Sequence, residues 1–345
     1  MQVLEQVPLA PYTTFCIGGP ARWFIDASSE GEVLEGVRFA REQNAPLFVL
    51  GGGSNLLVSD AGFPGVVLHI ALKGIEMQAV GPMTRFSVAA GEEWDAFVSR
   101  AVDQDCGGIE CLAGIPGSVG GTPVQNVGAY GQEVAETVRT VRVFDLETMR
   151  FVELSASLCG FAYRRSIFNT SRRGRYIVTR VEYDFINAAT ALVSYADLKR
   201  YFQDANFSPT LPEVSKAVRE IRHQKGMLIV QGDPDCRSAG SFFKNPVISS
   251  EHFRQIAATV VGAEAPHYPT EGGQVKVPAA WLLDQAGFHK GYVLGRAGIS
   301  SKHTLALINR DHASASDIAT LRDAIIAKVA EKFAIHLEPE PVWVG

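Results

Sequence analysis

The sequence has 345 residues, of which 46% are hydrophobic and 20% are charged, and its formal net charge is -5. This is the composition of a globular protein, so intrinsic disorder is excluded as the main state, and the length predicts two domains or three small ones. The chain carries no run of basic residues, which argues against nucleic acid and an anionic membrane as partners.

The first part of the chain is predicted to form a βαβ-like unit. Hydrophobic patterning indicates strands at 21–25, 46–50 and 66–70, and a helix at 30–43 that begins with a capping box of Ser29 and Glu32. The following part, up to residue 185, has an α+β pattern. Here a helix is expected at 94–105, with strands at 85–90, 138–144, 151–154 and 176–185.

The pattern changes after residue 187, which indicates a domain junction between 187 and 235. Two strands are expected beyond it, at 305–309 and 335–344. The helices expected here lie at 195–202, 211–223, 250–259, 278–285 and 316–333.

The five cysteines are an odd number and include no CxxC pair, so neither a disulfide framework nor a zinc site is indicated. No histidine stands at a metal-ligand spacing, and we expect no bound metal. The N-terminus lacks the pattern of a signal peptide, and no apolar run approaches the ~20 residues that cross a bilayer. We therefore expect a cytoplasmic protein without a membrane partner.

Glycine is concentrated in two segments. The first, Gly51-Gly52-Gly53-Ser54-Asn55, follows an expected strand and is either a flexible turn or a cradle in which backbone N–H groups converge on a phosphate. It contains no GK[ST], and Leu56 stands where GxGxxG requires glycine, so a P-loop and a plain Rossmann site are disfavoured.

The second segment, 114–131, holds eight glycine or proline residues in 18 positions, more than structural turns usually need. The two segments also supply neutral hydrogen-bonding side chains, namely Ser54, Asn55, Ser118 and Asn126. Together they suit an extended ligand with a diphosphate and a flat ring, and FAD has that shape.

Three further positions could carry chemistry. Arg164 and Arg165 lie in the aromatic segment 161–168, and they are either an exposed charged pair or include a group that binds a carboxylate and stabilises an enolate. Ser241 is either a loop hydroxyl or a proton donor, since its surroundings are not those of a GxSxG nucleophile. Glu340 stands between two prolines that fix the backbone, although such a glutamate is usually exposed to solvent.

Taken in order, seven motifs resemble one family, the UDP-N-acetylenolpyruvoylglucosamine reductases, also called UDP-N-acetylmuramate dehydrogenases. These flavoenzymes act in the synthesis of the bacterial peptidoglycan precursor. The resemblance covers nearly the whole chain and rests on segments 13–18, 51–58, 113–120, 126–131, 163–164, 240–246 and 337–340.

The resemblance implies an α+β fold, with an FAD-binding domain of the vanillyl-alcohol-oxidase type made of two α+β subdomains and a C-terminal α+β substrate-binding domain. We place the subdomains at 1–72 and 73–206 and the substrate domain at 207–345, with the last strand, 335–345, returning to the FAD domain. FAD is then expected to contact Gly51, Gly52, Gly53, Ser54, Asn55, Leu56, Ile115, Pro116, Gly117, Ser118, Gly120, Gly121, Asn126, Gly128, Ala129 and Tyr130.

By the same resemblance, the catalytic residues are Arg164, Ser241 and Glu340. The segment 192–198 is similar to the loop by which one branch of the family brings a tyrosine over the substrate, which here is Tyr195. The remaining residues expected to bind the UDP-sugar are Lys225, Asn245, Tyr268, Lys276 and His303.

The activity implied is the reduction of UDP-N-acetylglucosamine enolpyruvate to UDP-N-acetylmuramate, with NADPH as reductant, and we expect the enzyme to be a monomer. Hydride would pass from NADPH to the N5 atom of FAD and then to the vinyl carbon, and Ser241 would supply the proton. Two alternatives remain open at this point. A related FAD-dependent oxidase would consume oxygen, and a non-catalytic flavin-binding protein would lack the catalytic trio.

Overall fold

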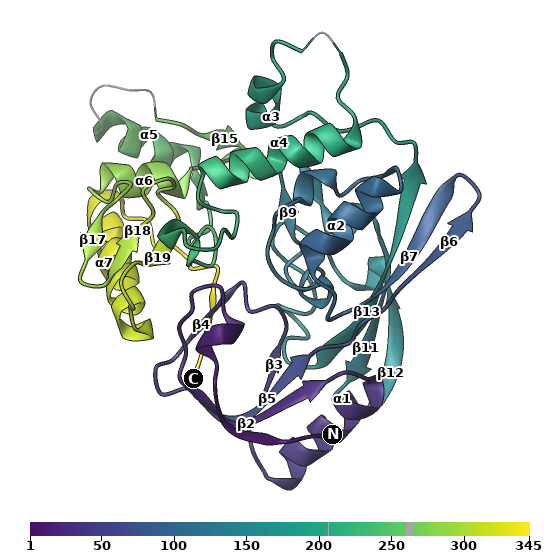
Figure 1. Cartoon of the computed structure of the whole chain (residues 1–345). Coiled ribbons are helices and arrows are strands. Elements are labelled where there is room, and N and C mark those ends of the chain that lie inside the picture. The colour runs from purple at the N-terminus through teal and green to yellow at the C-terminus, as the bar shows by residue number, and fades with distance from the viewer. Residues whose placement is uncertain (206, 260–264) are drawn as a thin grey trace. The chain divides into compact units, whose positions relative to one another are not determined.

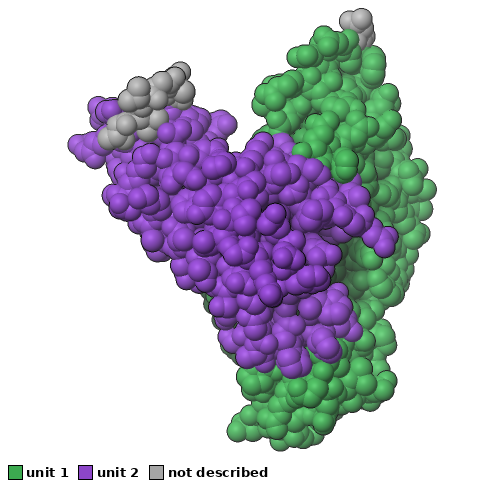
Figure 2. Space-filling view, turned by 60° about the vertical axis from the view of Figure 1, so that its left-hand side comes forward, with its two compact units in different colours: residues 1–7, 21–53, 63–224 green, residues 8–20, 54–62, 225–345 purple. Residues whose placement is uncertain are grey.

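The computed structural model describes residues 1–205, 207–259 and 265–345. The chain forms two compact units, each assembled from separate stretches of sequence. Unit 1 comprises residues 1–7, 21–53 and 63–224, and unit 2 comprises 8–20, 54–62 and 225–345 (Figure 2). Each unit has its own apolar core. The division expected at residues 72 and 206 stays a prediction.

The first sheet of unit 1 confirms the predicted βαβ-like unit. Strands β2 and β3 both run parallel to β5, which lies between them in the order β1-β2-β5-β3. Helix α1 packs on this sheet so closely that a Cβ on Gly36 would lie 2.7 Å from Leu68 Cδ1. The elements are β1 (Leu4–Pro8), β2 (Pro20–Ala27), α1 (Glu30–Glu42), β3 (Leu47–Leu50) and β5 (Phe63–Ile70).

The predicted capping box of α1 is half correct. Ser29 Oγ accepts a hydrogen bond from the Glu32 N–H at 3.2 Å, as expected of an N-cap. The Glu32 carboxylate, however, accepts from the N–H and the hydroxyl of Ser28, at 2.8 and 2.6 Å, and not from the Ser29 N–H. Ser28 offers two donors to one carboxylate oxygen, whereas Ser29 would offer only one.

The second sheet of unit 1 is antiparallel, in the order β12-β11-β13-β7-β6 (Figure 1). The predicted strands of this region are confirmed, while β6 and the short β8, which pairs with the end of β13, were not predicted. The strands are β6 (Ile75–Val80), β7 (Met83–Ala89), β8 (Cys106–Gly107), β11 (Val138–Asp145), β12 (Arg150–Ser155) and β13 (Tyr176–Asn187).

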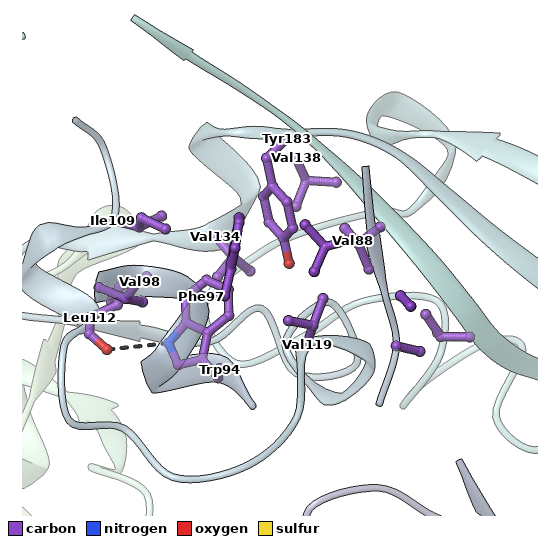
Figure 3. Close-up of a cluster of buried hydrophobic side chains, with 14 of the residues drawn as sticks. Val88, Trp94, Phe97, Val98, Ile109, Leu112, Val119, Val134, Val138 and Tyr183 are labelled. Carbon is purple, nitrogen blue, oxygen red and sulfur yellow. Dashed lines mark hydrogen bonds between the residues drawn. The ribbon is translucent and has the colours of Figure 1, made fainter. Parts of the chain in front are cut away.

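Helix α2 (Trp94–Asp103) covers the second sheet and shares its core. Trp94 and Phe97 lie among Val88 of β7 and Tyr183 of β13, and the Trp94 indole N–H donates to the Leu112 carbonyl at 3.2 Å (Figure 3). The helix ends two residues before the predicted limit, because Asp105 has a left-handed backbone with φ of 56°. The other elements of unit 1 are β9 (Gly128–Ala129), β10 (Gln132–Glu133), α3 (Ala196–Tyr201) and α4 (Leu211–Gln224).

Unit 2 contains two small sheets, β14-β16-β15 and β17-β18-β19, and the parallel pair β4 and β20. Helix α7 begins with a complete capping box of Ser314 and Asp317. The elements are β4 (Leu56–Val58), β14 (Val247–Ser249), α5 (Ser250–Thr259), β15 (Tyr268–Pro269), β16 (Gln274–Lys276), α6 (Ala279–Gln285), β17 (Val293–Leu294), β18 (Ala297–Ile299), β19 (Leu307–Asn309), α7 (Ala315–Phe333) and β20 (Val342–Val344).

The helices predicted after residue 187 are confirmed to within two residues at either end. The long strand predicted at 335–344 is wrong, because only 342–344 is a strand. Pro339 and Pro341 have no N–H to donate to a continuous ladder. The residues between them and α7 instead make isolated backbone bonds, such as Lys244 N–H to the Glu338 carbonyl at 3.0 Å.

Short 3₁₀ turns join these elements at Ala10–Tyr12, Glu110–Leu112, Val119–Gly121, Val134–Glu136, Ala156–Leu158, Pro234–Cys236 and Glu271–Gly273. Across the described ranges, no helix combines the length and the apolar character of a membrane span.

Candidate active site

The two glycine-rich segments meet in unit 1. The Gly52 N–H donates to Ser118 Oγ at 3.2 Å. A Cβ on Gly52 would lie 2.6 Å from Gly117 Cα, and a Cβ on Gly51 would lie 2.8 Å from Ser118 Oγ. No side chain fits at this crossing, so glycine is required there by close approach of the two backbones.

The residues that join β7 to α2 hold the second segment in place. The Gly117 carbonyl accepts from the Trp94 N–H at 3.0 Å, and the Gly120 N–H donates to the Ala90 carbonyl at 2.8 Å. Gly117 has a φ of 123°, which residues with a Cβ rarely adopt. These two bonds fix the backbone of this segment relative to β7 and α2.

Gly114 is bound from two sides. Its N–H donates to the Asp95 carboxylate of α2, and its carbonyl accepts from Arg222 Nε of α4 at 3.0 Å. Arg222 is buried and is also hydrogen-bonded to Tyr130. Burial lowers the pKa of the Arg222 guanidinium and raises the pKa of the Tyr130 phenol to about 12. Arg222 is not recognisable from the sequence as part of this site, because an arginine in an amphipathic helix is typical of an exposed face.

The segment 126–131 is tied to the turn that carries Arg164. The buried Asn126 side chain donates to Glu133 Oε2 at 2.6 Å and to the Ala162 carbonyl at 3.1 Å. Arg164 Nη1 in turn donates to the Gly128 carbonyl at 2.9 Å. The Asn126 amide therefore shapes this segment, while a contact between Asn126 and FAD stays a prediction.

Arg164 occupies a tight two-residue turn. Ala162 and Arg165 exchange two backbone hydrogen bonds, at 3.0 and 2.9 Å, and Arg164 between them has a φ of 55°. A left-handed backbone at a residue other than glycine costs about 1–2 kcal/mol. Residues with a strained backbone cluster at active sites and ligand-binding sites.

Ser241 and Glu340 lie on neighbouring stretches of backbone in unit 2. The Glu340 N–H donates to the carbonyl of Phe242 at 2.9 Å, and Phe243 forms a bridge with Pro339. Both phenylalanines are fully buried and anchor this pairing. Asn55 joins the same region, since its Nδ2 donates to the Glu340 carbonyl at 3.2 Å. Three residues predicted for the site are thus brought together.

The residues predicted to bind the UDP-sugar divide between the units. Tyr195 lies in unit 1, where its ring packs edge-to-face on Tyr130 with 5.5 Å between ring centres. In unit 2, Tyr268 and Lys276 stand directly opposite each other in the β15–β16 pair. Lys225 is the first residue of the long C-terminal stretch of that unit.

The side chains of Asn245 and His303 each accept a hydrogen bond from a backbone N–H. Asn245 Oδ1 accepts from the Ala279 N–H at 2.9 Å, so this oxygen caps the start of α6. His303 Nδ1 accepts from the Leu305 N–H at 3.0 Å. The neutral ring of His303 therefore carries its proton on Nε2 and acts there as a donor. No group of three His, Cys, Asp or Glu side chains in the described part of the chain could hold a metal ion.

Comparison with known proteins shows the family of the chain. Residues 21–155 match the family model of an FAD binding domain, and residues 233–344 match that of the UDP-N-acetylenolpyruvoylglucosamine reductase C-terminal domain. The UDP-N-acetylenolpyruvoylglucosamine reductase of Thermobifida fusca is 46% identical over 99% of this chain and 98% of its own length. That of Streptomyces coelicolor is 44% identical over 100% of this chain and 91% of its own.

Among solved structures, the crystal structure of UDP-N-acetylenolpyruvylglucosamine reductase from Thermus caldophilus is similar over 100% of both chains, with a TM-score of 0.68 and 28% identity. The likeness therefore extends through both units and is not confined to the FAD-binding part.

Proposed function

Because the chain belongs to the UDP-N-acetylenolpyruvoylglucosamine reductase family, we propose that it reduces UDP-N-acetylenolpyruvoylglucosamine with NADPH in peptidoglycan synthesis. The FAD binding domain and the C-terminal domain of these reductases are both present. The structural observation that carries the proposal is the crossing of Gly52 and Gly117, since a flavoenzyme of this kind requires a place for a dinucleotide.

The residues at the crossing fit FAD. Two backbones without side chains approach within contact distance, and such N–H-rich loops bind phosphates. Gly51 to Leu56, together with 115–118 and 120–121, would hold the cofactor, with Asn126 and 128–130 as further contacts. The chemistry that bound FAD supplies is two-electron transfer from NADPH to the enolpyruvyl double bond.

Arg164 would stabilise the charge that develops on the substrate. Addition of hydride to the vinyl carbon leaves negative charge on the adjacent carbon and its carboxylate, and a guanidinium binds such a group through two parallel N–H donors. The strained turn at 162–165 and the bond to the Gly128 carbonyl support this role, because both fix the direction of the side chain.

Ser241 would deliver the proton that completes the reduction, and Glu340 would polarise the substrate carboxylate or orient Arg164. An enolate carbon is a strong base, so a positioned hydroxyl suffices as its acid. The hydrogen bond between the Glu340 N–H and the Phe242 carbonyl supports a shared role for Ser241 and Glu340, because it fixes their two stretches of backbone side by side. Tyr195, Lys225, Asn245, Tyr268, Lys276 and His303 would bind the UDP-sugar.

The experiment that tests the function is the visible spectrum of the purified protein under anaerobic conditions. A yellow protein that bleaches with NADPH and regains its colour when the enolpyruvyl UDP-sugar is added would establish cofactor, reductant and acceptor together. A colourless protein that takes up no FAD would contradict the assignment of both glycine-rich segments. No response to the sugar, followed by reoxidation once oxygen is admitted, would indicate the oxidase alternative.

A further inference from the structure

Unit 1 contains a buried carboxylate to which the proposed reaction gives no role. Glu110, in the 3₁₀ turn after β8, is 1% exposed. Its Oε2 accepts from the Gly108 N–H at 2.7 Å, and its Oε1 accepts from Gln132 Nε2 at 2.8 Å and from the Leu192 N–H at 3.3 Å. Burying a carboxylate is costly, and these three donors compensate for the water that it has lost.

Gln132 connects this carboxylate to the second glycine-rich segment. It is 3% exposed and its Oε1 accepts from the Cys111 N–H at 2.8 Å, so both ends of the amide are bound to the turn at 110–112. Gln132 also follows Gly131 directly and pairs with Ala129 across the β9–β10 hairpin. The conformation of 128–131 is therefore fixed relative to Glu110.

Leu192 connects the same carboxylate to Tyr195. Its carbonyl accepts from Cys111 Sγ at 3.5 Å, so both backbone groups of Leu192 are bound to the 110–112 turn. Further along, Ser194 Oγ lies 2.6 Å from the position that a Cβ on Gly131 would take, and the Tyr195 ring packs on Tyr130. The segment 192–195 thus runs along 130–131.

We propose that Glu110 and Gln132 are positioning residues that anchor the Tyr195 segment to the loop at 128–131. Neither would contact substrate or cofactor. Through Leu192 they set where the Tyr195 side chain stands, and thereby the affinity for the UDP-sugar. This inference rests on the proposed function, in which Tyr195 binds that sugar and 128–130 contact FAD.

The test uses the full-length holoenzyme with Glu110→Gln. Glutamine has one acceptor oxygen, so at least one of the three donors loses its partner. We expect the KM for the UDP-sugar to rise roughly ten- to hundredfold, which corresponds to the loss of one hydrogen bond to a charged group. The rate of flavin reduction by NADPH should stay within about twofold of wild type, and amide hydrogen exchange should accelerate at 191–195.

Tyr183→Phe is the matched control, because it also removes one buried hydrogen bond from unit 1, that between Tyr183 and Thr122 at 3.0 Å. It should lower the melting temperature while the KM for the sugar and the exchange at 191–195 stay unchanged. If Glu110→Gln fails to fold, Leu192→Pro is the test variant that replaces it. It removes the N–H that Glu110 accepts and leaves the carboxylate and its other two donors in place, and the Leu192 side chain is 39% exposed.

A double-mutant cycle separates positioning from general damage. If Glu110 acts through Tyr195, Glu110→Gln should add little to the KM of Tyr195→Ala, whereas independent effects would multiply. Full multiplication, or unchanged exchange at 191–195 in Glu110→Gln, would overturn the proposal. Should Tyr195→Ala itself leave the KM unchanged, the assigned role of Tyr195 fails and the proposal fails with it, while the exchange data still report separately whether the anchor exists.

Discussion

The position of Ser241 is fixed by the backbone conformation and the packing of its neighbours in the chain, and not by a contact of its own side chain. Gly240 before it has a φ of 74°, and Phe242 and Phe243 after it are buried. Ser241→Ala should therefore leave the fold and the reduction of bound flavin by NADPH near wild type. Reoxidation by the enolpyruvyl sugar should slow by orders of magnitude, because the proton donor is gone. Stopped-flow absorbance of each half-reaction measures this, and Ser241→Cys should retain part of the second rate. Equal slowing of both halves would refute the proton-donor role.

Arg164 and Arg165 offer a matched pair at adjacent positions. Arg164 is partly buried in its turn and donates to Gly128, whereas Arg165 is exposed. Arg164→Lys keeps the charge but loses the planar fork of donors, so the sugar half-reaction should slow roughly a hundredfold. Arg165→Lys should behave like wild type. If single-turnover rates fall equally in both variants, the slowing comes from a disturbance of the turn as a whole, and the role assigned to Arg164 is contradicted.

At single positions, the sequence revealed residue types but not all of their partners. Arg164, Ser241 and Glu340 were recognisable because each stands in a motif. Arg222 was not, since its importance depends on burial and on a bond to Gly114. Gln132 likewise meets Glu110 across 22 positions through side chains, a contact that no local pattern encodes. Asn126 is predicted to contact FAD because it stands in a glycine-rich motif. The sequence did not reveal the hydrogen bonds that its amide donates to Glu133 and to the Ala162 carbonyl.

At the scale of elements, the crossing of the glycine-rich segments makes a sharp prediction. Gly52→Val would place side-chain atoms where Gly117 and Ser118 stand, so the two loops must separate. We expect the purified variant to be colourless and to bind added FAD at least tenfold more weakly, measured by fluorescence titration, while far-ultraviolet circular dichroism stays unchanged.

The control is Gly31→Ala in helix α1, where a Cβ would meet only Ser29 Oγ at 3.8 Å. This variant should keep its flavin and gain about 0.5–1 kcal/mol of stability, because alanine is the better helix former. Full FAD affinity in Gly52→Val would remove the crossing from the cofactor site.

Elements were predictable where they were long enough to show a period. The helices and the strands β7, β11, β12 and β13 of the large antiparallel sheet carry patterns of 3.6 and 2 residues and are predicted correctly, whereas β6 of the same sheet is mostly exposed and is not. Strands β14 to β18 have two or three residues each, which is too short for any period to appear, and in this region only β19 was predicted, within the strand expected at 305–309. At the end of the chain, which Pro339 and Pro341 interrupt, apolar residues alternate and predict one long strand, although most of them form no ladder.

At the scale of the whole molecule, unit 2 depends on two short stretches from the beginning of the chain. Phe15, Ile17 and Leu57 are part of its core. Strand β20 finds its partner in β4, and the Asp60 carboxylate accepts from the Ala315 N–H at 2.7 Å at the start of α7. The pairing of β4 with β20, over more than 280 positions, lies beyond local sequence patterns, since nothing in a three-residue strand specifies its partner.

This arrangement predicts that the C-terminal stretch does not fold alone. A fragment of residues 225–345 keeps most of the unit 2 core but lacks Phe15, Ile17 and Leu57. The loss of a large buried side chain lowers the free energy of unfolding by about 2–5 kcal/mol. Three such losses together are as large as the whole free energy of unfolding of a typical domain, which is roughly 5–15 kcal/mol. Strand β20 would also be left without its partner.

The fragment should therefore show poor dispersion in its NMR spectrum and no cooperative thermal transition. Adding the missing stretches at its N-terminus, as residues 8–20 and 54–62 joined by flexible linkers, should restore both, because the core and the β4–β20 pair are then complete. A cooperative transition in the fragment alone would show that the early stretches cover a core that is already stable. The C-terminal stretch would then be a domain in its own right, and the contribution of residues 8–20 and 54–62 would be confined to placing Asn55 beside Glu340.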